Sequence, residues 1–233
     1  MRAALIGNRE DTDAGIIGHV LRERGFSFVE FAREDPGSYS SDPAGFDLVV
    51  AMGSSWSAYW ERVATETAAE RAFLGGAHSA GVPVLGVCFG AQQLAMTLGG
   101  TVTRAETPEI GWHNVTSIPE ASSIPGAETL AGQWFQWHYD RFTVPGGAVA
   151  LAESPAAPQA FTIGRTLALQ FHPEATVSIV MHWARGGGEQ ELVDAGIDPG
   201  ELFAGTSALM ADVAPRTERL VDWFLDRSAL AHE

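Results

Sequence analysis

The chain has 233 residues, a length that suits one α/β domain or at most two small ones. Its formal net charge of −15 makes a nucleic-acid backbone or an anionic membrane surface an unfavourable partner. All of its basic residues are arginine, which excludes a Schiff-base lysine and the lysine of a phosphate-binding loop. The single cysteine excludes an intramolecular disulfide framework and leaves one candidate for a reactive thiol.

The sequence shows no sign of a targeting segment or of a bound group. The apolar run at Arg2–Gly7 is too short for a signal peptide, and no stretch reaches the apolar length of a membrane span. A lone cysteine suits a reducing compartment, so a cytoplasmic location is expected. Because the histidines are scattered without ligand spacing, we expect no metal, and no cofactor is indicated.

The first part of the chain alternates short apolar runs with helical patterns. The predicted strands are Arg2–Gly7, Ser27–Phe31, Phe46–Met52 and Pro83–Val87, and the predicted helices are Asp11–Arg24, Thr65–Ala80 and Gln92–Leu98. Residues 35–45 are rich in proline, glycine and serine and are predicted to form a loop. This order of elements predicts an α/β fold with an open, mostly parallel central sheet flanked by helices on both faces.

The pattern changes after Thr101. Short runs with β propensity follow one another and are separated by proline and glycine, which predicts antiparallel strands added to the same domain. These runs are Thr101–Arg104, Val115–Ile118, Ala148–Glu153, Gln159–Ile163 and Thr166–Phe171.

The C-terminal part of the chain is predicted to be helical. A helix is expected over Thr176–Arg185, and two or three more over residues 189–232, the last at Arg216–Arg227. We therefore expect a single domain over residues 1–233, with a core at 1–185 and a C-terminal helical extension at 186–233.

The stretch Gly86-Val87-Cys88-Phe89-Gly90 ends the central predicted strand. It has the G-x-C-x-G spacing of a nucleophile elbow, with sulfur in place of oxygen. The glycines permit a sharp strand-to-helix turn whose central residue is strained. The following helix presents N–H groups and its positive dipole end to the sulfur, which favours the thiolate. A buried structural cysteine is the alternative, but the two spaced glycines favour Cys88 as a nucleophile.

A thiolate nucleophile needs a base, and histidine is the usual one. His172 has the most informative context, because the apolar run Leu167–Leu169 leads into it and places it at a strand end. Carboxyl ends of the strands in an open sheet share one edge, so His172 and Cys88 are expected at the same edge. Glu174 can orient the imidazole and stabilise its cation, and Pro173 stiffens the turn between them.

These motifs resemble the class I glutamine amidotransferases, the glutaminase domains with a Cys-His-Glu triad. The elbow G-V-C-F-G-x-Q and the later Q-F-H-P-E carry the resemblance. The intervening stretches Glu109-Ile110-Gly111-Trp112 and Trp137-His138-Tyr139-Asp140 are closest to the GMP-synthetase-like branch with its free-standing members. The resemblance covers about Arg2 to Arg185 and implies the flavodoxin-like fold of that family, with glutamine or a γ-glutamyl compound as substrate.

The resemblance also implies roles for the three principal residues. Cys88 would attack the side-chain amide carbon of the substrate and form a γ-glutamyl thioester. His172 would protonate the leaving nitrogen and then activate water. Glu174 would orient His172.

An oxyanion hole is implied by the same resemblance. Its donors would be the N–H of Phe89, directly after the nucleophile, and that of Gly53. The family usually has Gly-Gly-Pro in this loop, whereas this chain has Met52-Gly53-Ser54-Ser55. A glycine directly after a strand can still expose its N–H to a ligand. Gln92, four residues after Cys88, matches the family glutamine that helps to hold the substrate.

Three further residues are predicted to bind substrate. His138 and Glu109 would border the pocket, and the alternative for both is that they hold a loop. Trp56 follows the proposed oxyanion loop and would line an apolar pocket, with packing as its alternative.

The expected function is that of a glutaminase subunit that releases ammonia and glutamate. A separate synthase subunit would accept the ammonia, because the sequence has no Ser-Gly-Gly-x-Asp-Ser loop for ATP pyrophosphate chemistry. One alternative is a free-standing hydrolase of γ-glutamyl peptides or amides. The other is a non-catalytic interaction module with the same fold.

Overall fold

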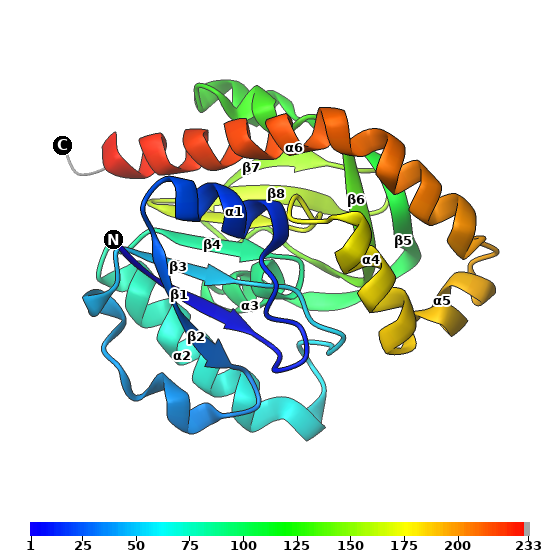
Figure 1. Cartoon of the computed structure of the whole chain (residues 1–233). Coiled ribbons are helices and arrows are strands. Elements are labelled where there is room, and N and C mark those ends of the chain that lie inside the picture. The colour runs from blue at the N-terminus through cyan, green and yellow to red at the C-terminus, as the bar shows by residue number, and fades with distance from the viewer. Residues whose placement is uncertain (231–233) are drawn as a thin grey trace.

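The computed structural model describes residues 1–230, so the last three residues of the predicted C-terminal extension lie outside the described residues. Within this range, nine strands form one sheet in the order β2-β1-β3-β4-β9-β8-β7-β5-β6. The first five strands of this order are parallel and the remainder are antiparallel. The sheet is therefore mixed, with its parallel half flanked by helices (Figure 1).

The parallel half has the predicted order of elements. Its strands are β1 (Arg2–Gly7), β2 (Ser27–Ala32), β3 (Leu48–Ala51), β4 (Val84–Val87) and β9 (Thr166–Leu169), and its helices are α1 (Gly15–Glu23), α2 (Ala64–Ser79) and α3 (Phe89–Thr97). Every residue of β3, β4 and β9 is buried, as expected for parallel strands that are covered on both faces. The loop at 35–45 contains two short 3₁₀ turns.

The strand at Thr166 corrects the prediction that all strands after Thr101 are antiparallel additions. It pairs in parallel with β4, from Val84 with Thr166 to Val87 with Leu169, and only its other edge is antiparallel, to β8. The chain leaves the sheet after α3, forms the antiparallel strands and returns beside β4. The side-chain pattern of a strand does not tell whether its partner is parallel or antiparallel when the strand is buried on both faces.

The antiparallel half differs most from the prediction. Its strands are β5 (Val102–Ser117), β6 (Gly132–Phe142), β7 (Val149–Glu153) and β8 (Pro158–Ile163). The first two predicted runs belong to one long strand, β5, whose pairing with β6 is irregular between Arg104 and Glu109. The strand β6 was not predicted, because consecutive residues such as Trp134, Phe135 and Gln136 are all buried and remove the alternation.

Three helices complete the described chain: α4 (Val177–Trp183), α5 (Glu189–Asp194) and α6 (Pro199–Leu230). The predicted helix Arg216–Arg227 is only a part of α6, which continues through Pro215. A proline inside a helix costs about 3 kcal/mol. Burial of Val213 and Phe224 on either side of it, among other apolar side chains of α6, offsets this cost.

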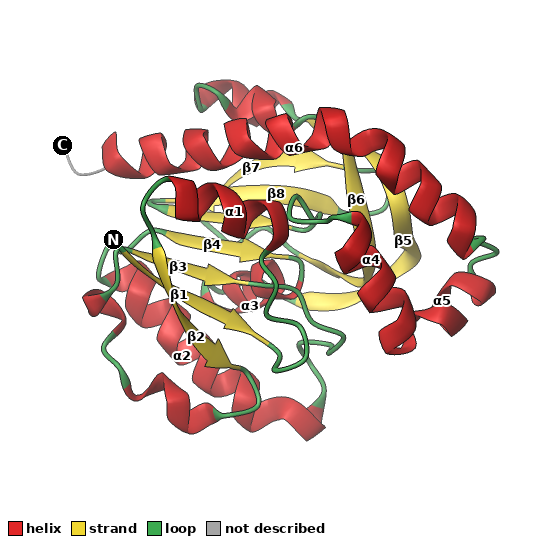
Figure 2. Ribbon diagram, in the orientation of Figure 1, coloured by secondary structure: helices red, strands yellow, loops and turns green. Residues whose placement is uncertain are grey.

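Two apolar layers hold the parallel half together. One joins α1 and α6 to one face of the sheet, and the other joins α2 and α3 to the opposite face (Figure 1). The strands β5 and β6 cross the end of the sheet to which the parallel strands point (Figure 2). This arrangement brings β6 against the carboxyl edge of the parallel strands. No described helix combines the length and apolarity that a membrane span needs.

Candidate active site

The elbow forms at the end of β4 and puts Cys88 in a strained conformation. Cys88 has φ 49° and ψ −105°, and it is the only non-glycine residue at positive φ among residues 1–230. A Cβ at Gly90 would lie 2.1 Å from the carbonyl oxygen of Ala51, and one at Gly86 would lie 2.5 Å from Leu94. Both glycines are therefore required by close packing at the turn.

His172 follows β9 and is held from three sides. Its N–H donates to the carbonyl oxygen of Phe135 on β6 at 2.8 Å. Its Nδ1 lies 2.8 Å from Oε1 of Glu174. The hydroxyl of Thr217 on α6 donates to the carbonyl oxygen of Pro173 at 2.8 Å and fixes the turn between the pair. A carboxylate at this distance accepts the N–H of Nδ1, so Nε2 is the ring nitrogen that Glu174 does not engage.

The structure brings Cys88 and His172 together at one edge of the sheet. A Cβ at Gly53 would lie 3.1 Å from Cε1 of His172 and 3.8 Å from Cβ of Cys88, so the loop after β3 touches both residues. The side chains of Cys88 and His172 are nearly excluded from water. Within the described chain, Nε2 of His172 has no hydrogen-bond partner.

The electrostatic environment favours a charged imidazole. Burial alone lowers the pKa of His172, but the carboxylate of Glu174 and, after it, the sulfur of Cys88 raise that pKa well above its ordinary value. A charge pair between sulfur and imidazolium is the reactive form that a cysteine nucleophile needs. Water exclusion strengthens these interactions.

The sulfur has two further polar neighbours that the sequence did not indicate. Nε2 of Gln170 lies 3.6 Å from Sγ, and the carbonyl oxygen of Trp137 lies 3.9 Å from it. Trp137 belongs to β6, so the antiparallel half contributes one side of the site. The only sequence signal for Gln170 was its place before Phe171 and His172 in the Q-F-H-P-E motif.

Aromatic side chains pack against the imidazole of His172. The ring of Trp183 lies 4.7 Å from that of His172, and its Nε1 donates to Oδ2 of Asp11 at 2.8 Å. Burial raises the pKa of Asp11, although the hydrogen bond from Trp183 opposes this. Trp137 donates from Nε1 to Glu191 at 2.6 Å. Sequence reasoning missed these side chains, because their elements meet only in the folded chain.

The predicted oxyanion donors belong to two segments that meet at Cys88. Phe89 is the first residue of α3, and the first N–H groups of a helix point out of its N-terminal end. Gly53 follows β3 and lies against Cys88 and His172. Gln92, on the first turn of α3, is buried and donates to Gln170 at 3.3 Å, which connects it to the residue beside the sulfur.

Three predicted residues remain, and two of them face each other. Glu109 and His138 form a buried pair on β5 and β6, with Nε2 of His138 at 3.1 Å from Oε2 of Glu109, outside the angular range of a hydrogen bond. The same carboxylate oxygen accepts from Ser154 at 2.8 Å and Gln159 at 2.9 Å. Trp56 is half-buried and packs against the apolar layer of α2 and α3.

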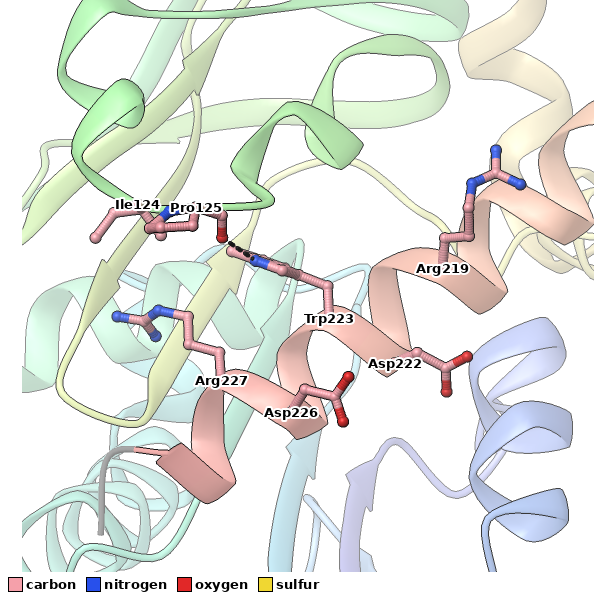
Figure 3. A pocket seen from close by; sticks show the side chains of 7 residues that line it. All are labelled: Ile124, Pro125, Arg219, Asp222, Trp223, Asp226 and Arg227. Carbon is pink, nitrogen blue, oxygen red and sulfur yellow. Dashed lines mark hydrogen bonds between the residues drawn. The ribbon is translucent and has the colours of Figure 1, made fainter. Parts of the chain in front are cut away.

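A surface hollow lies elsewhere on the molecule. It has a volume of about 480 Å³ and is formed by α6 and residues 124–125, with Trp223 donating to the carbonyl oxygen of Pro125 (Figure 3). None of the predicted site residues lines it. In the described chain, no group of three or more His, Cys, Asp or Glu side chains is placed to hold a metal ion.

Comparison with known proteins agrees with this fold. The family model described as glutamine amidotransferase class-I matches residues 59–180, more than half of the chain. The glutamine-hydrolysing GMP synthase of Acetivibrio thermocellus is 36% identical over 109 residues, which cover 46% of this chain and 20% of that protein. The same enzyme of Rhodopseudomonas palustris is 39% identical over 101 residues, covering 41% and 19%. The match thus spans about a fifth of these relatives.

Solved structures extend the similarity over the whole fold. The crystal structure of a glutamine amidotransferase from Thermotoga maritima has a TM-score of 0.81 and 25% sequence identity to this chain. The match covers 96% of this chain and 98% of that one. A second, from Methylobacillus flagellatus, is 24% identical with a TM-score of 0.78 over 97% of this chain and 94% of that one, and it supports the fold. On these grounds the chain belongs to the class I glutamine amidotransferase family and is similar to its GMP-synthetase-like branch.

Proposed function

We propose that the protein hydrolyses the side-chain amide of glutamine, with Cys88 as nucleophile, His172 as acid and base, and Glu174 as the residue that orients the imidazole. The observation that carries this proposal is the placement of the His172–Glu174 pair beside a strained cysteine at the elbow. Family membership supports the amidotransferase class of the reaction.

The geometry supports a two-step mechanism. The sulfur of Cys88 forms a bond to the amide carbon, and the thiol proton resides on Nε2 of His172. When the C–N bond breaks, the imidazolium gives this proton to the leaving nitrogen, ammonia departs and a γ-glutamyl thioester remains. His172 then removes a proton from water, whose oxygen attacks the thioester. Glutamate leaves as the proton returns to Cys88.

Two further groups of residues assist these steps. The oxygen of each tetrahedral intermediate would be stabilised by N–H groups from Phe89 and from the loop at Gly53. Gln92 would hold the substrate, because it contacts Gln170 beside the sulfur. Glu109, His138 and Trp56 remain predicted substrate-binding residues.

We further infer that the released ammonia serves a separate synthase subunit. The support is the similarity to glutamine-hydrolysing GMP synthases, of which this chain matches about a fifth of the length. Turnover of glutamine that rises when such a synthase is added would support this inference. Fast cleavage of γ-glutamyl peptides or anilides by the isolated protein would instead favour a free-standing hydrolase.

The central test is covalent labelling of the residue that attacks the substrate. A diazoketone analogue of glutamine should add one equivalent to the wild type, and peptide mass spectrometry should locate it on Cys88. Cys88→Ala should take up none and should lose turnover by roughly 10⁴-fold or more. Turnover that survives in Cys88→Ala, or an adduct on another residue, would refute the proposal.

A further inference from the structure

A fully buried arginine lies behind the loop that follows β3. Arg33 comes directly after β2, and neither its side chain nor that of Glu70 on α2 is exposed. The guanidinium binds Glu70 through Nε at 2.7 Å and Nη2 at 3.1 Å, and Nη1 donates to Oδ1 of Asn8 at 2.7 Å. Glu70 on α2 and Asn8, the residue after β1, therefore anchor this cation in one orientation.

The remaining donors of Arg33 are directed at two consecutive carbonyl groups of the loop. Nη2 donates to the oxygen of Met52 and Nη1 to that of Gly53, both at 3.1 Å. The oxygen of Met52 also accepts from the N–H of Gly90 at 3.2 Å. The guanidinium lies 4.7 Å from the ring centre of Phe89. Arg33 thus contacts both segments to which the oxyanion donors are assigned.

The orientation of these carbonyl groups determines that of the neighbouring N–H groups. No described peptide bond is cis, and in a trans peptide the N–H points opposite to the C=O. With the carbonyls of Met52 and Gly53 directed at Arg33, the N–H groups of Gly53 and Ser54 are directed away from it. The loop meets Cys88 and His172 through Gly53. A rotated peptide here would replace a donor with a carbonyl oxygen.

The geometry points to Arg33, anchored by Glu70, as a positioning residue that holds the loop after β3 with its N–H groups available to the oxyanion. This inference rests on the proposed function, because it assigns a task in the same reaction. A buried ion pair adds little stability over an apolar pair of similar volume, so the Arg33–Glu70 pair is not explained by stability alone. Only a forked cation with several fixed donors can orient two successive carbonyls.

The test separates loop orientation from folding. Arg33→Lys keeps a cation for Glu70 but loses the fork, and Arg33→Met with Glu70→Met removes both buried charges together. The control is Arg24→Gln: this arginine, a third of whose side chain is exposed, also makes a fork, to Asp222 and Glu218, and it joins the end of α1 to α6 away from the loop. Each variant is compared with the wild type by thermal unfolding and by circular dichroism.

Three readouts are needed for each folded variant. In both Arg33 variants we expect kcat for glutamine to fall roughly 10- to 100-fold, with KM little changed. A glutamine analogue with an aldehyde at the reacting carbon forms a tetrahedral adduct, and its affinity should fall by the same factor. Alkylation of Cys88 by iodoacetamide forms no oxyanion and should be preserved. Arg24→Gln should match the wild type in all three.

The outcomes are distinct. Wild-type kcat and aldehyde affinity in a folded variant that lacks the fork would overturn the role of Arg33. Equal losses of turnover, aldehyde affinity and alkylation would also overturn it, because they indicate a collapsed site. If the wild type itself forms neither a Cys88 adduct nor glutamate, the proposed function fails, whatever the Arg33 variants do.

Discussion

Two buried histidine–glutamate pairs lie in different halves of this molecule. His172 and Glu174 follow β9 in the parallel half, and His138 and Glu109 lie on β5 and β6 in the antiparallel half. Each pair is nearly excluded from solvent, and the closest nitrogen–oxygen distances are 2.8 Å and 3.1 Å. By residue type, burial and distance alone, either pair qualifies as a catalytic dyad.

The two pairs differ in the number of hydrogen bonds that their polar atoms make. Glu109 accepts hydrogen bonds from Ser154 and Gln159 besides facing His138, whose Nδ1 lies 3.1 Å from the carbonyl oxygen of its own neighbour Asp140. In contrast, Oε2 of Glu174 accepts no hydrogen bond within residues 1–230. Nε2 of both histidines lacks a hydrogen-bond partner there, but that of His138 lies 3.1 Å from the carboxylate of Glu109. An unpaired polar atom in a buried site is costly, so the free atoms of His172 and Glu174 call for a partner such as a ligand.

The first prediction contrasts the two histidines and has the largest expected effect. His172→Gln removes the proposed acid and base and should lower kcat/KM for glutamine by roughly 10⁴- to 10⁶-fold. His138→Gln should lower it less than about tenfold and act mainly on stability. Steady-state ammonia release measures both. Similar losses in the two variants would remove the distinction between the pairs.

The second prediction contrasts the two carboxylates. Glu174→Gln no longer selects the tautomer of His172, and kcat should fall by roughly 10²- to 10⁴-fold. Glu109→Gln keeps an acceptor for its neighbours and should have a much smaller effect on kcat. An increase in KM in Glu109→Gln would instead support the sequence prediction that Glu109 borders the substrate.

The third prediction concerns pH. The folded-state pKa of His172 is raised above that of the unfolded chain, about 6.5. The imidazolium therefore adds stability that is complete below that value and is lost as pH rises through the folded pKa. Urea unfolding across this range should show the decline in the wild type and a weaker one in Glu174→Gln. NMR titration of the ring should show a lower pKa in the variant. An unchanged titration would contradict the role of Glu174.

The fourth prediction has the smallest expected effect and concerns the stability that Glu109 contributes. Burial alone raises the pKa of Glu109, but His138 and Ser154 lower it below the ordinary value. Its contribution to stability is thus present above the unfolded-state pKa and is lost as pH falls through the folded one. Glu109→Gln should reduce the free energy of unfolding at neutral pH by about 1–3 kcal/mol. A loss confined to acid pH would show that the charge is not what matters.

The elbow and the parallel half could be predicted from the sequence because their signals are local. Gly86 is required by packing against Gly90 and Leu94 in the same turn and helix, and the alternation of apolar runs with helices specifies the order of elements. The strand β6 and the continuation of α6 through Pro215 could not be predicted. In both cases burial against distant elements outweighs the local pattern.

The sequence by itself determined the strand-to-helix turn at Cys88 and the His-Pro-Glu turn, because the residues that shape each of them are neighbours along the chain. Only the tertiary structure decided that β9 lies beside β4, which places His172 next to Cys88. It also decided that Arg33, which two acidic residues follow in the sequence, is fully buried behind the loop after β3. Contacts between elements far apart in the chain leave no periodic pattern in either segment, so they become visible only when the sheet is assembled.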